Sequence, residues 1–240
     1  RPMPDPKDIL GSISGGHVLD VATGSGGFIH FLLAGLCDYS EIIGVDANPR
    51  VAEAFATAFK DHPAIRFVQM DAHNLDFAPA AFDTVCISNS LHHFEHPSHI
   101  LQQMKRVLRP GGRLILAEMY CDGQTETQLT HVHLHHWWAA VDRAVGDHIH
   151  FETYSRQELI DLFNTQELEE VSLFDISDTT EDPKAPEVIA ELEAVIDRYI
   201  QRASAHPELQ SRGEALRRRV HQIGFHSATT VVAVGRKPVV

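Results

Sequence analysis

The residues from His17 to Gly27, with the sequence HVLDVATGSGG, have the types and spacing of a ligand-binding turn. A short apolar run holds the acid Asp20 and leads into a loop where Gly24 and Gly26 permit positive φ and close approach of a ligand to the backbone. The next residues, FIHFLLAGL, start a helix whose unpaired N–H groups point back into the loop. Such a turn is compatible with a dinucleotide site, another phosphate site or plain tight packing. It is not the phosphate loop of a nucleoside triphosphatase, because no Lys-Ser or Lys-Thr pair follows the last glycine.

Two further acids stand at the ends of apolar runs and favour a nucleoside ligand. Asp46 lies in EIIGVDANP at 41–49, and Asp71 lies in IRFVQMDAHNLDF at 65–77. The distance in sequence from Asp20 to Asp46 places the second carboxylate beside the glycine loop, at the end of the neighbouring strand, where it can accept hydrogen bonds from both ribose hydroxyls. The plain alternative for Asp46 is a helix cap.

The histidine-rich stretch THVHLHHWW begins at Thr130 and is the other group of side chains that could do chemistry. If it is helical, His131, His135, Trp138 and Asp142 share one face by spacings of four, three and four. Three interpretations stay open. The face contacts a substrate and moves protons, or His131 and His135 ligate one metal ion, or the residues only pack a helix. Because no further ligands can be placed, we assign no metal-binding residues.

Composition limits the class of protein. The 240 residues, 43% of them hydrophobic, predict a single α/β domain with elaborations. The formal net charge of −13 disfavours phosphate-rich partners, so we expect no nucleic acid. Three widely spaced cysteines imply neither a disulfide framework nor a Cys-based zinc site, and fit a reducing cytoplasm. With no apolar run of ~20 residues and no pattern of a secretion signal, we expect no membrane and a cytoplasmic location.

The order of the elements predicts how these residues are positioned. Strand patterns alternate with helix patterns five times over about 120 residues, which is typical of a doubly wound, mostly parallel sheet with ligands at the carboxyl ends of its strands. Within this part, a helix is expected at 99–109, stopped by Pro110-Gly111-Gly112. Further on, Ser155 and Glu158 have capping-box spacing. Strand patterns follow at 168–177 and 227–237, with two helices between them.

Five motifs carry a resemblance to a known family. They are VLDVATGSGG, GVDANP, QMDAHNLDF, FDTVCISNSLHHF and MKRVLRPGGRLILAE, in this order over residues 17–118. With them the chain resembles the class I methyltransferases that use S-adenosylmethionine, and within these the methyltransferase type 11 and UbiE-like group. The resemblance implies an α/β fold with a doubly wound seven-stranded sheet, mostly parallel and Rossmann-like, whose last strand is antiparallel between the fifth and sixth. One departure is Ala22, where the motif usually has glycine. Since alanine is small, we expect the loop to hold and the cofactor to shift slightly.

The resemblance also implies a division of the chain. We expect one methyltransferase domain over 1–240, with a cofactor-binding core at 14–120. A helical lid insertion is expected at 121–153, after the fifth strand, and a two-helix insertion at 181–224, before the last strand. The second insertion either extends the lid or forms the surface of a homodimer, and the sequence does not choose between them.

The resemblance also implies roles for the residues that match positions in the family's motifs. The cofactor is S-adenosyl-L-methionine. Asp46 is expected to bind the ribose hydroxyls, Asp71 to accept from the adenine amino group, and Ser88 and Asn89 to line the methyl side. The full set of expected cofactor-binding residues is Asp20, Ala22, Thr23, Gly24, Gly26, Asp46, Ala47, Asp71, Ala72, Ser88 and Asn89. The candidates for contact with a small-molecule methyl acceptor or for acid/base work are His93, His131, His135 and Trp138.

The expected reaction is in-line displacement at the methyl group of the sulfonium, in which the enzyme supplies alignment and desolvation. A phenol, alcohol or ammonium acceptor also needs a base, and histidine suits neutral pH. One alternative is a protein that binds S-adenosylmethionine without transferring its methyl group. A nicotinamide-dependent oxidoreductase shares the glycine loop and the ribose acid. Against it stand the LRPGG turn, Asp71 and the absence of a Tyr-x-x-x-Lys pair.

Overall fold

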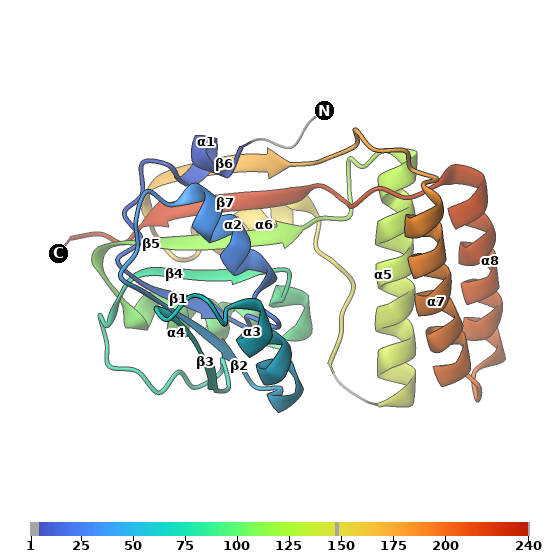
Figure 1. Cartoon of the computed structure of the whole chain (residues 1–240), viewed down its shortest axis with the longest axis horizontal. Helices are drawn as coiled ribbons and strands as arrows, with labels where there is room; N and C mark the ends of the chain where they lie inside the picture. Colours follow the sequence, from blue (N-terminus) through green and yellow to red (C-terminus); the bar gives the residue numbers. More distant parts are fainter. Residues whose placement is uncertain (1–4, 147–148, 240) are drawn as a thin grey trace.

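The computed structural model describes residues 5–146 and 149–239 and is built on one seven-stranded sheet (Figure 1). The strand order is β3-β2-β1-β4-β5-β7-β6. The strands from β3 to β5 in this order run parallel, whereas β7 is antiparallel to both β5 and β6. The expected sheet is therefore confirmed, including the last strand between the fifth and sixth. The strands are β1 (His17–Val21), β2 (Glu41–Asp46), β3 (Ile65–Gln69), β4 (Phe82–Ser88), β5 (Leu108–Met119), β6 (Glu169–Ile176) and β7 (Thr230–Arg236).

The central strands explain why ligand-binding residues collect at one edge. The apolar side chains of β1, β2 and β4 are buried on both faces of the sheet, as expected for parallel strands covered by helices. In register, Asp20 of β1 stands opposite Gly44 of β2 and Cys86 of β4. Since parallel strands end at a common edge, Asp46 at the end of β2 and Asn89 just after β4 come to lie beside the glycine loop that follows β1.

Helices cover both faces of the sheet and form two apolar clusters with it. One cluster contains Ile29 and Leu32 of α2, and the other contains Ile100 and Met104 of α4. Helix α6 begins with the capping box expected at Ser155 and Glu158. The helices and 3-10 turns around the sheet are α1 (Pro6–Leu10), α2 (Gly27–Gly35), η1 (Pro49–Val51), α3 (Ala52–Ala58), η2 (Leu91–His93), α4 (Pro97–Val107) and α6 (Arg156–Asn164).

The end of α4 corrects one expectation. The helix stops at Val107, two residues before the expected end at 109, and β5 already begins at Leu108. A residue before proline disfavours the α conformation, so the helix cannot continue up to Pro110. Instead of forming a free turn, the Leu-Arg-Pro-Gly-Gly segment pairs with the end of the chain, where the N–H of Gly111 donates to the carbonyl of Lys237 at 2.8 Å.

Three further helices, α5 (Glu126–Val145), α7 (Pro186–Arg202) and α8 (Pro207–Ile223), stand side by side beyond the carboxyl ends of the parallel strands (Figure 1). They enclose their own apolar core, which includes Trp137, Ile196 and Val220. The segment after β5 and the segment before β7 thus fold into one three-helix unit, while the expected limits of the insertions and the homodimer stay predictions. None of the helices in the described part of the chain combines the length and apolar character needed to cross a bilayer.

Candidate active site

A first cavity of about 470 Å³ opens between the glycine loop and the ends of β4, β5 and β7. Its wall combines backbone of the loop with small polar side chains at the sheet edge. The lining residues are Asp20, Ala22, Thr23, Gly24, Ser25, Gly27, Phe28, Phe31, Ser88, Asn89, Ser90, Ala117, Ile176, Thr230 and Val232.

A second, larger cavity of about 1060 Å³ shares the loop and extends from the end of β2 to the three-helix unit. Acidic side chains line it on the sheet side, and arginine and tyrosine side chains of α7 line it on the other. The lining residues are Ala22, Gly24, Asp46, Ala47, Asn48, Arg50, Met70, Asp71, Ala72, Asn89, Ser90, His93, Phe94, Ile149, Arg198, Tyr199 and Arg202.

The carboxylate of Asp46 is held at the junction of loop and cavity by two backbone N–H groups. Gly24 donates to Oδ2 and Asn48 donates to Oδ1, each at 2.9 Å. An ionised carboxylate has about four acceptor sites, so each oxygen can still accept a hydroxyl donor from the cavity. Asp71 is similarly fixed, because the N–H and ring of His73 bond its Oδ1 and lower the pKa of the Asp71 carboxyl. Two fixed carboxylates therefore face one cavity.

Asp20 is a buried acid in the wall of the smaller cavity. Its side chain is 1% exposed. The hydroxyl of Thr23 donates to Oδ2 at 2.6 Å, and the thiol of Cys86 lies 3.4 Å from Oδ1. Burial outweighs these two hydrogen bonds and raises the pKa of Asp20 to about 6, with the nearby charge of Asp46 adding to the rise. The acid consequently changes its charge close to neutral pH.

The loop departs from the family motif at a strained position. Ala22 has φ +54°, in the left-handed region where an L-residue other than glycine is disfavoured. The loop does hold with alanine, as expected, but the cost of the replacement is conformational rather than one of space. Gly26, at φ +89°, is needed for packing, because a Cβ there would lie 2.2 Å from the ring of Phe59.

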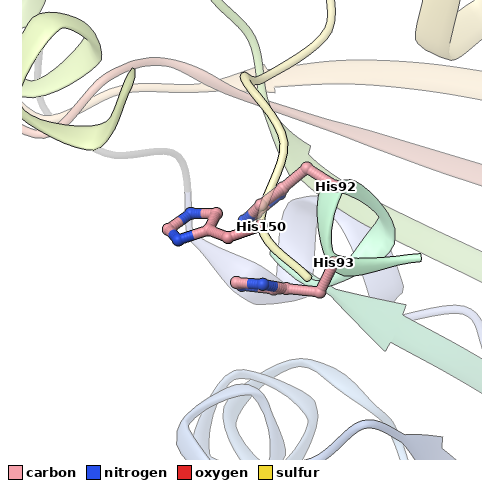
Figure 2. Close-up of side chains that lie close together, drawn as sticks. All are labelled: His92, His93 and His150. Carbon is pink, nitrogen blue, oxygen red and sulfur yellow. The ribbon is translucent and has the colours of Figure 1, made fainter. Parts of the chain in front are cut away.

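Three histidines gather beside the larger cavity (Figure 2). His92 and His93 belong to η2, after β4, and His150 follows α5. The Nδ1 atom of His92 lies 2.6 Å from Glu118, and the Nδ1 atom of His150 lies 2.7 Å from Asp142. Glu118 also accepts the N–H groups of Ser90 and Leu91, at 3.0 and 3.1 Å. Buried carboxylates thus fix two of the three rings.

The histidine face of α5 forms as expected, but its side chains line neither of the two cavities. The ring of His135 is 6.4 Å from that of His131 and 6.1 Å from that of Trp138. The Nδ1 atom of His131 accepts the N–H of Ala228, and burial lowers the pKa of His131 to about 4. Burial and the neighbouring imidazoles lower the pKa of His135 to about 2. Of the four expected contact residues, His93 lines a cavity, whereas His131, His135 and Trp138 line neither of the two described.

Residues 19–116 match the sequence model of a family described as a methyltransferase domain. Over this range the chain is similar to the class I methyltransferases that use S-adenosylmethionine. A demethylmenaquinone methyltransferase of Thermotoga maritima is 33% identical over 102 residues, which are 42% of this chain and 43% of that protein. A ubiquinone/menaquinone biosynthesis C-methyltransferase UbiE of Ectopseudomonas mendocina is 32% identical over 114 residues, 46% of this chain and 44% of that protein. The chain thus matches less than half the length of either relative.

Solved structures support the methyltransferase fold over almost the whole chain. The match to a putative methyltransferase from Bacillus halodurans includes 98% of this chain and 97% of that one, with a TM-score of 0.63 and 16% identity. The match to a protein described as the [4+2]-cyclase SpnF includes 98% of this chain and 79% of that one, with a TM-score of 0.64 and 18% identity. At such identities the likeness concerns the fold, and the different reaction in the second name shows that this fold does not determine the chemistry.

The polar groups of the two cavities fit S-adenosylmethionine. The fixed oxygens of Asp46 suit a ribose diol, and Asp71 suits an amino group. A Cβ added at Gly24 would meet no atom within 4 Å, so the backbone there borders open space in which a ligand can lie. All expected cofactor-binding residues except Gly26 line one or both cavities, although their contacts with the cofactor stay predictions.

Several residues at the two cavities and in the histidine cluster were not expected from the sequence. Arg198, Tyr199 and Arg202 reach the larger cavity from α7, which is more than a hundred residues from the loop they face. His150 and Glu118 were missed as well. Glu118 is the last residue of the LILAE motif, and an acid at the end of a buried strand was the one signal that could have drawn attention to it.

Proposed function

We propose that this chain transfers the methyl group of S-adenosylmethionine to a small-molecule acceptor bound between the sheet edge and the three-helix unit. The observation that carries the proposal is the larger cavity, which is lined by Asp46 and Asp71 at one end and by Tyr199 and Arg202 at the other. A cofactor bound through the two acids leaves the α7 side of this cavity for an acceptor. When bound, the cofactor supplies a methyl group that its sulfonium has already activated.

The residues of the chain would then provide alignment and exclude water. Asn89 adopts φ +44°, and its Oδ1 accepts the N–H of Met119 at 2.9 Å, which fixes the turn after β4 at the place where both cavities meet. Such fixed positioning is the main contribution that an enzyme makes to an in-line displacement. The three-helix unit covers the α7 side of the larger cavity and keeps the acceptor out of bulk water.

The lining on the acceptor side favours a molecule with both an apolar part and an acidic or phenolic oxygen. Met70, Phe94 and Ile149 are apolar, and Arg198 and Arg202 are cationic. The relatives named after menaquinone and ubiquinone biosynthesis make quinols the first acceptors to assay, although they match less than half of this chain. For His93 we propose contact with the acceptor. For His131, His135 and Trp138 the expected contact with the acceptor stays a prediction.

Calorimetry with S-adenosylmethionine, S-adenosylhomocysteine and NAD tests the cofactor, and transfer of labelled methyl to a panel of quinols, phenols, amines and thiols tests the reaction. We expect binding of the first two ligands and labelled product from an oxygen-bearing acceptor. Binding of NAD in their place would favour the oxidoreductase. Tight binding of S-adenosylmethionine with no methyl transfer to any acceptor class would favour a non-catalytic binder.

Two variants test the face of α5 in the same assay. If His135 and Trp138 contact the acceptor, His135→Ala and Trp138→Ala reduce turnover while the affinity for S-adenosylmethionine stays within a few-fold. Equal loss of cofactor affinity, or no loss of turnover, would show that these side chains only support the packing of the helix.

A further inference from the structure

The rings of His92, His93 and His150 are close enough to share one ion. Their candidate ligand nitrogens all lie within 4.8 Å of one another. Two nitrogens bound to the same tetrahedral zinc ion are about 3.4 Å apart, given Zn–N distances of about 2.0–2.1 Å. Figure 2 shows the three side chains lying close together, and side-chain rotations would have to close this difference.

Each of the three rings has an acceptor oxygen beside its Nδ1 atom. Nδ1 lies 2.6 Å from a carboxylate oxygen of Glu118 in His92, 3.2 Å from the carbonyl oxygen of Ile149 in His93, and 2.7 Å from a carboxylate oxygen of Asp142 in His150. Carbonyl and carboxylate oxygens only accept, so each Nδ1 atom is the donor in its hydrogen bond. Metal-binding histidines are typically oriented in this way by an acceptor on the other ring nitrogen.

A fourth imidazole stands next to the three. The Nε2 atom of His135 is within hydrogen-bond distance of the Nε2 atom of His150, at 3.4 Å, and two ligands on one ion have about the same spacing. The Nδ1 atom of His135 is buried and has no hydrogen-bond partner among the described residues. Four imidazoles therefore lie together, and buried carboxylates hold two of them.

We infer that His92, His93 and His150 bind one divalent transition metal ion of the zinc type, with His135 beside its fourth position. Imidazole ligands suit Zn²⁺, Cu²⁺, Ni²⁺ and Fe²⁺ rather than Mg²⁺ or Ca²⁺. Three histidines with an open fourth position are typical of sites where the ion also binds a small ligand. This site is not the His131 and His135 pair that the helical spacing indicates. The Nδ1 atom of His131 accepts a hydrogen bond from the N–H of Ala228, so its lone pair is already used.

The position of the site suggests a use for the ion. His93 lines the larger cavity, so the ion would lie at its wall and could hold an oxygen of the acceptor. Binding of the ion does not depend on the proposed methyl transfer, but this use of it does. As a ligand His93 could not also be a free base, and the metal content of the protein decides between the two roles.

The test is metal retention by protein purified without an affinity tag. The protein is stripped with a chelator, incubated with ZnCl₂ or CoCl₂, desalted and measured by elemental analysis, and the Co²⁺ form is also followed by its visible absorption. We expect about one equivalent of metal. His93→Ala and His150→Gln are expected to weaken binding at least tenfold, as is Glu118→Gln through the orientation of His92. His62→Ala, which removes an exposed histidine elsewhere, is the matched control and should bind as the unaltered protein does.

Two results would overturn the inference. One is unaltered protein that retains far less than one equivalent, which needs no variant and so does not depend on how the variants fold. The other is variants that remain folded by circular dichroism and bind metal like the His62→Ala control. Calorimetry with S-adenosylmethionine on the stripped protein separates this outcome from failure of the proposed function, because the cofactor residues lie outside the histidine cluster.

Discussion

Replacing Asp20 by Asn should remove a pH dependence from the free energy of unfolding. Burial raises the pKa of this carboxyl from 3.8 to about 6 in the folded protein. Asparagine has nearly the same shape and stays neutral at every pH, and its carbonyl oxygen can still accept the hydrogen bond that Thr23 donates at 2.6 Å. The substitution therefore changes the charge and retains the packing.

The sign and size of the effect follow from the raised pKa. Below pH 3.8 the carboxyl is protonated in both states, and its contribution to stability is fully present. As the pH rises above 3.8, the unfolded chain releases the proton first, so the contribution to stability falls progressively. Above the folded pKa of about 6 the carboxyl is ionised in both states, and the contribution has been lost. A difference of about 2 pKa units corresponds to about 3 kcal/mol, of which about 2 kcal/mol falls between pH 4.5 and 7.5.

Urea denaturation of the cofactor-free protein at a series of pH values measures this effect. The stability of Asp20→Asn minus that of the unaltered protein should rise by about 2 kcal/mol from pH 4.5 to 7.5. Asp61→Asn is the control, because it makes the same change of charge at an exposed position and should give a nearly flat difference. If the curves of the unaltered protein and Asp20→Asn run parallel, Asp20 is ionised at much lower pH, and the assignment of its pKa to burial is wrong.

Three further changes test the loop and the three-helix unit. Ala22→Gly should raise the free energy of unfolding by roughly 0.5–1 kcal/mol, because relief of the left-handed backbone exceeds the entropy that glycine adds to the unfolded chain; a fall in the urea midpoint would contradict this. Asp46→Asn should weaken S-adenosylmethionine binding at least tenfold in calorimetry through loss of an ionised acceptor, and an affinity within twofold would refute the ribose assignment. Gly213→Ala should lower the unfolding temperature despite a better helix propensity, because the new Cβ would lie 2.4 Å from the ring of Trp137. A higher unfolding temperature would show that α5 and α8 can separate without cost.

The grouping of Asp46 with the glycine loop at one edge of the sheet could be predicted because these residues are positioned by regular structure. Asp46 and the glycine loop stand at the ends of adjacent parallel strands, so the hydrogen bond from Gly24 to Asp46 follows from the order of strands. The apolar runs and the turn residues that bound them are enough to identify such strands. The residue that departs from the motif, Ala22, was also visible, but its φ angle was not, since the composition of a loop does not reveal which residue adopts the left-handed conformation.

The histidine cluster could not be predicted for a different reason. Helical spacing identified the neighbours His131 and His135 on one helix, and their side chains do lie on one face. Spacing within a helix, however, gives no information about which segment packs against that face. His92 follows β4 and His150 follows α5, so they meet only because the three-helix unit stands over the ends of the strands.

The three-helix unit, which borders the proposed acceptor site, lies outside the range that the family model matches. The matched family covers 19–116, and this range contains the loop, Asp46 and Asp71, but none of α5, α7 and α8. Arg202 of α7 shows how closely the unmatched part is connected to the site: it lines the larger cavity and lies 2.7 Å from Asp142, which in turn holds His150. A side chain that touches the cavity is thus one contact away from the carboxylate that orients a histidine of the cluster. Selectivity for the acceptor should accordingly change with substitutions in α7, while the affinity for S-adenosylmethionine should change with substitutions at the ends of β1 and β2.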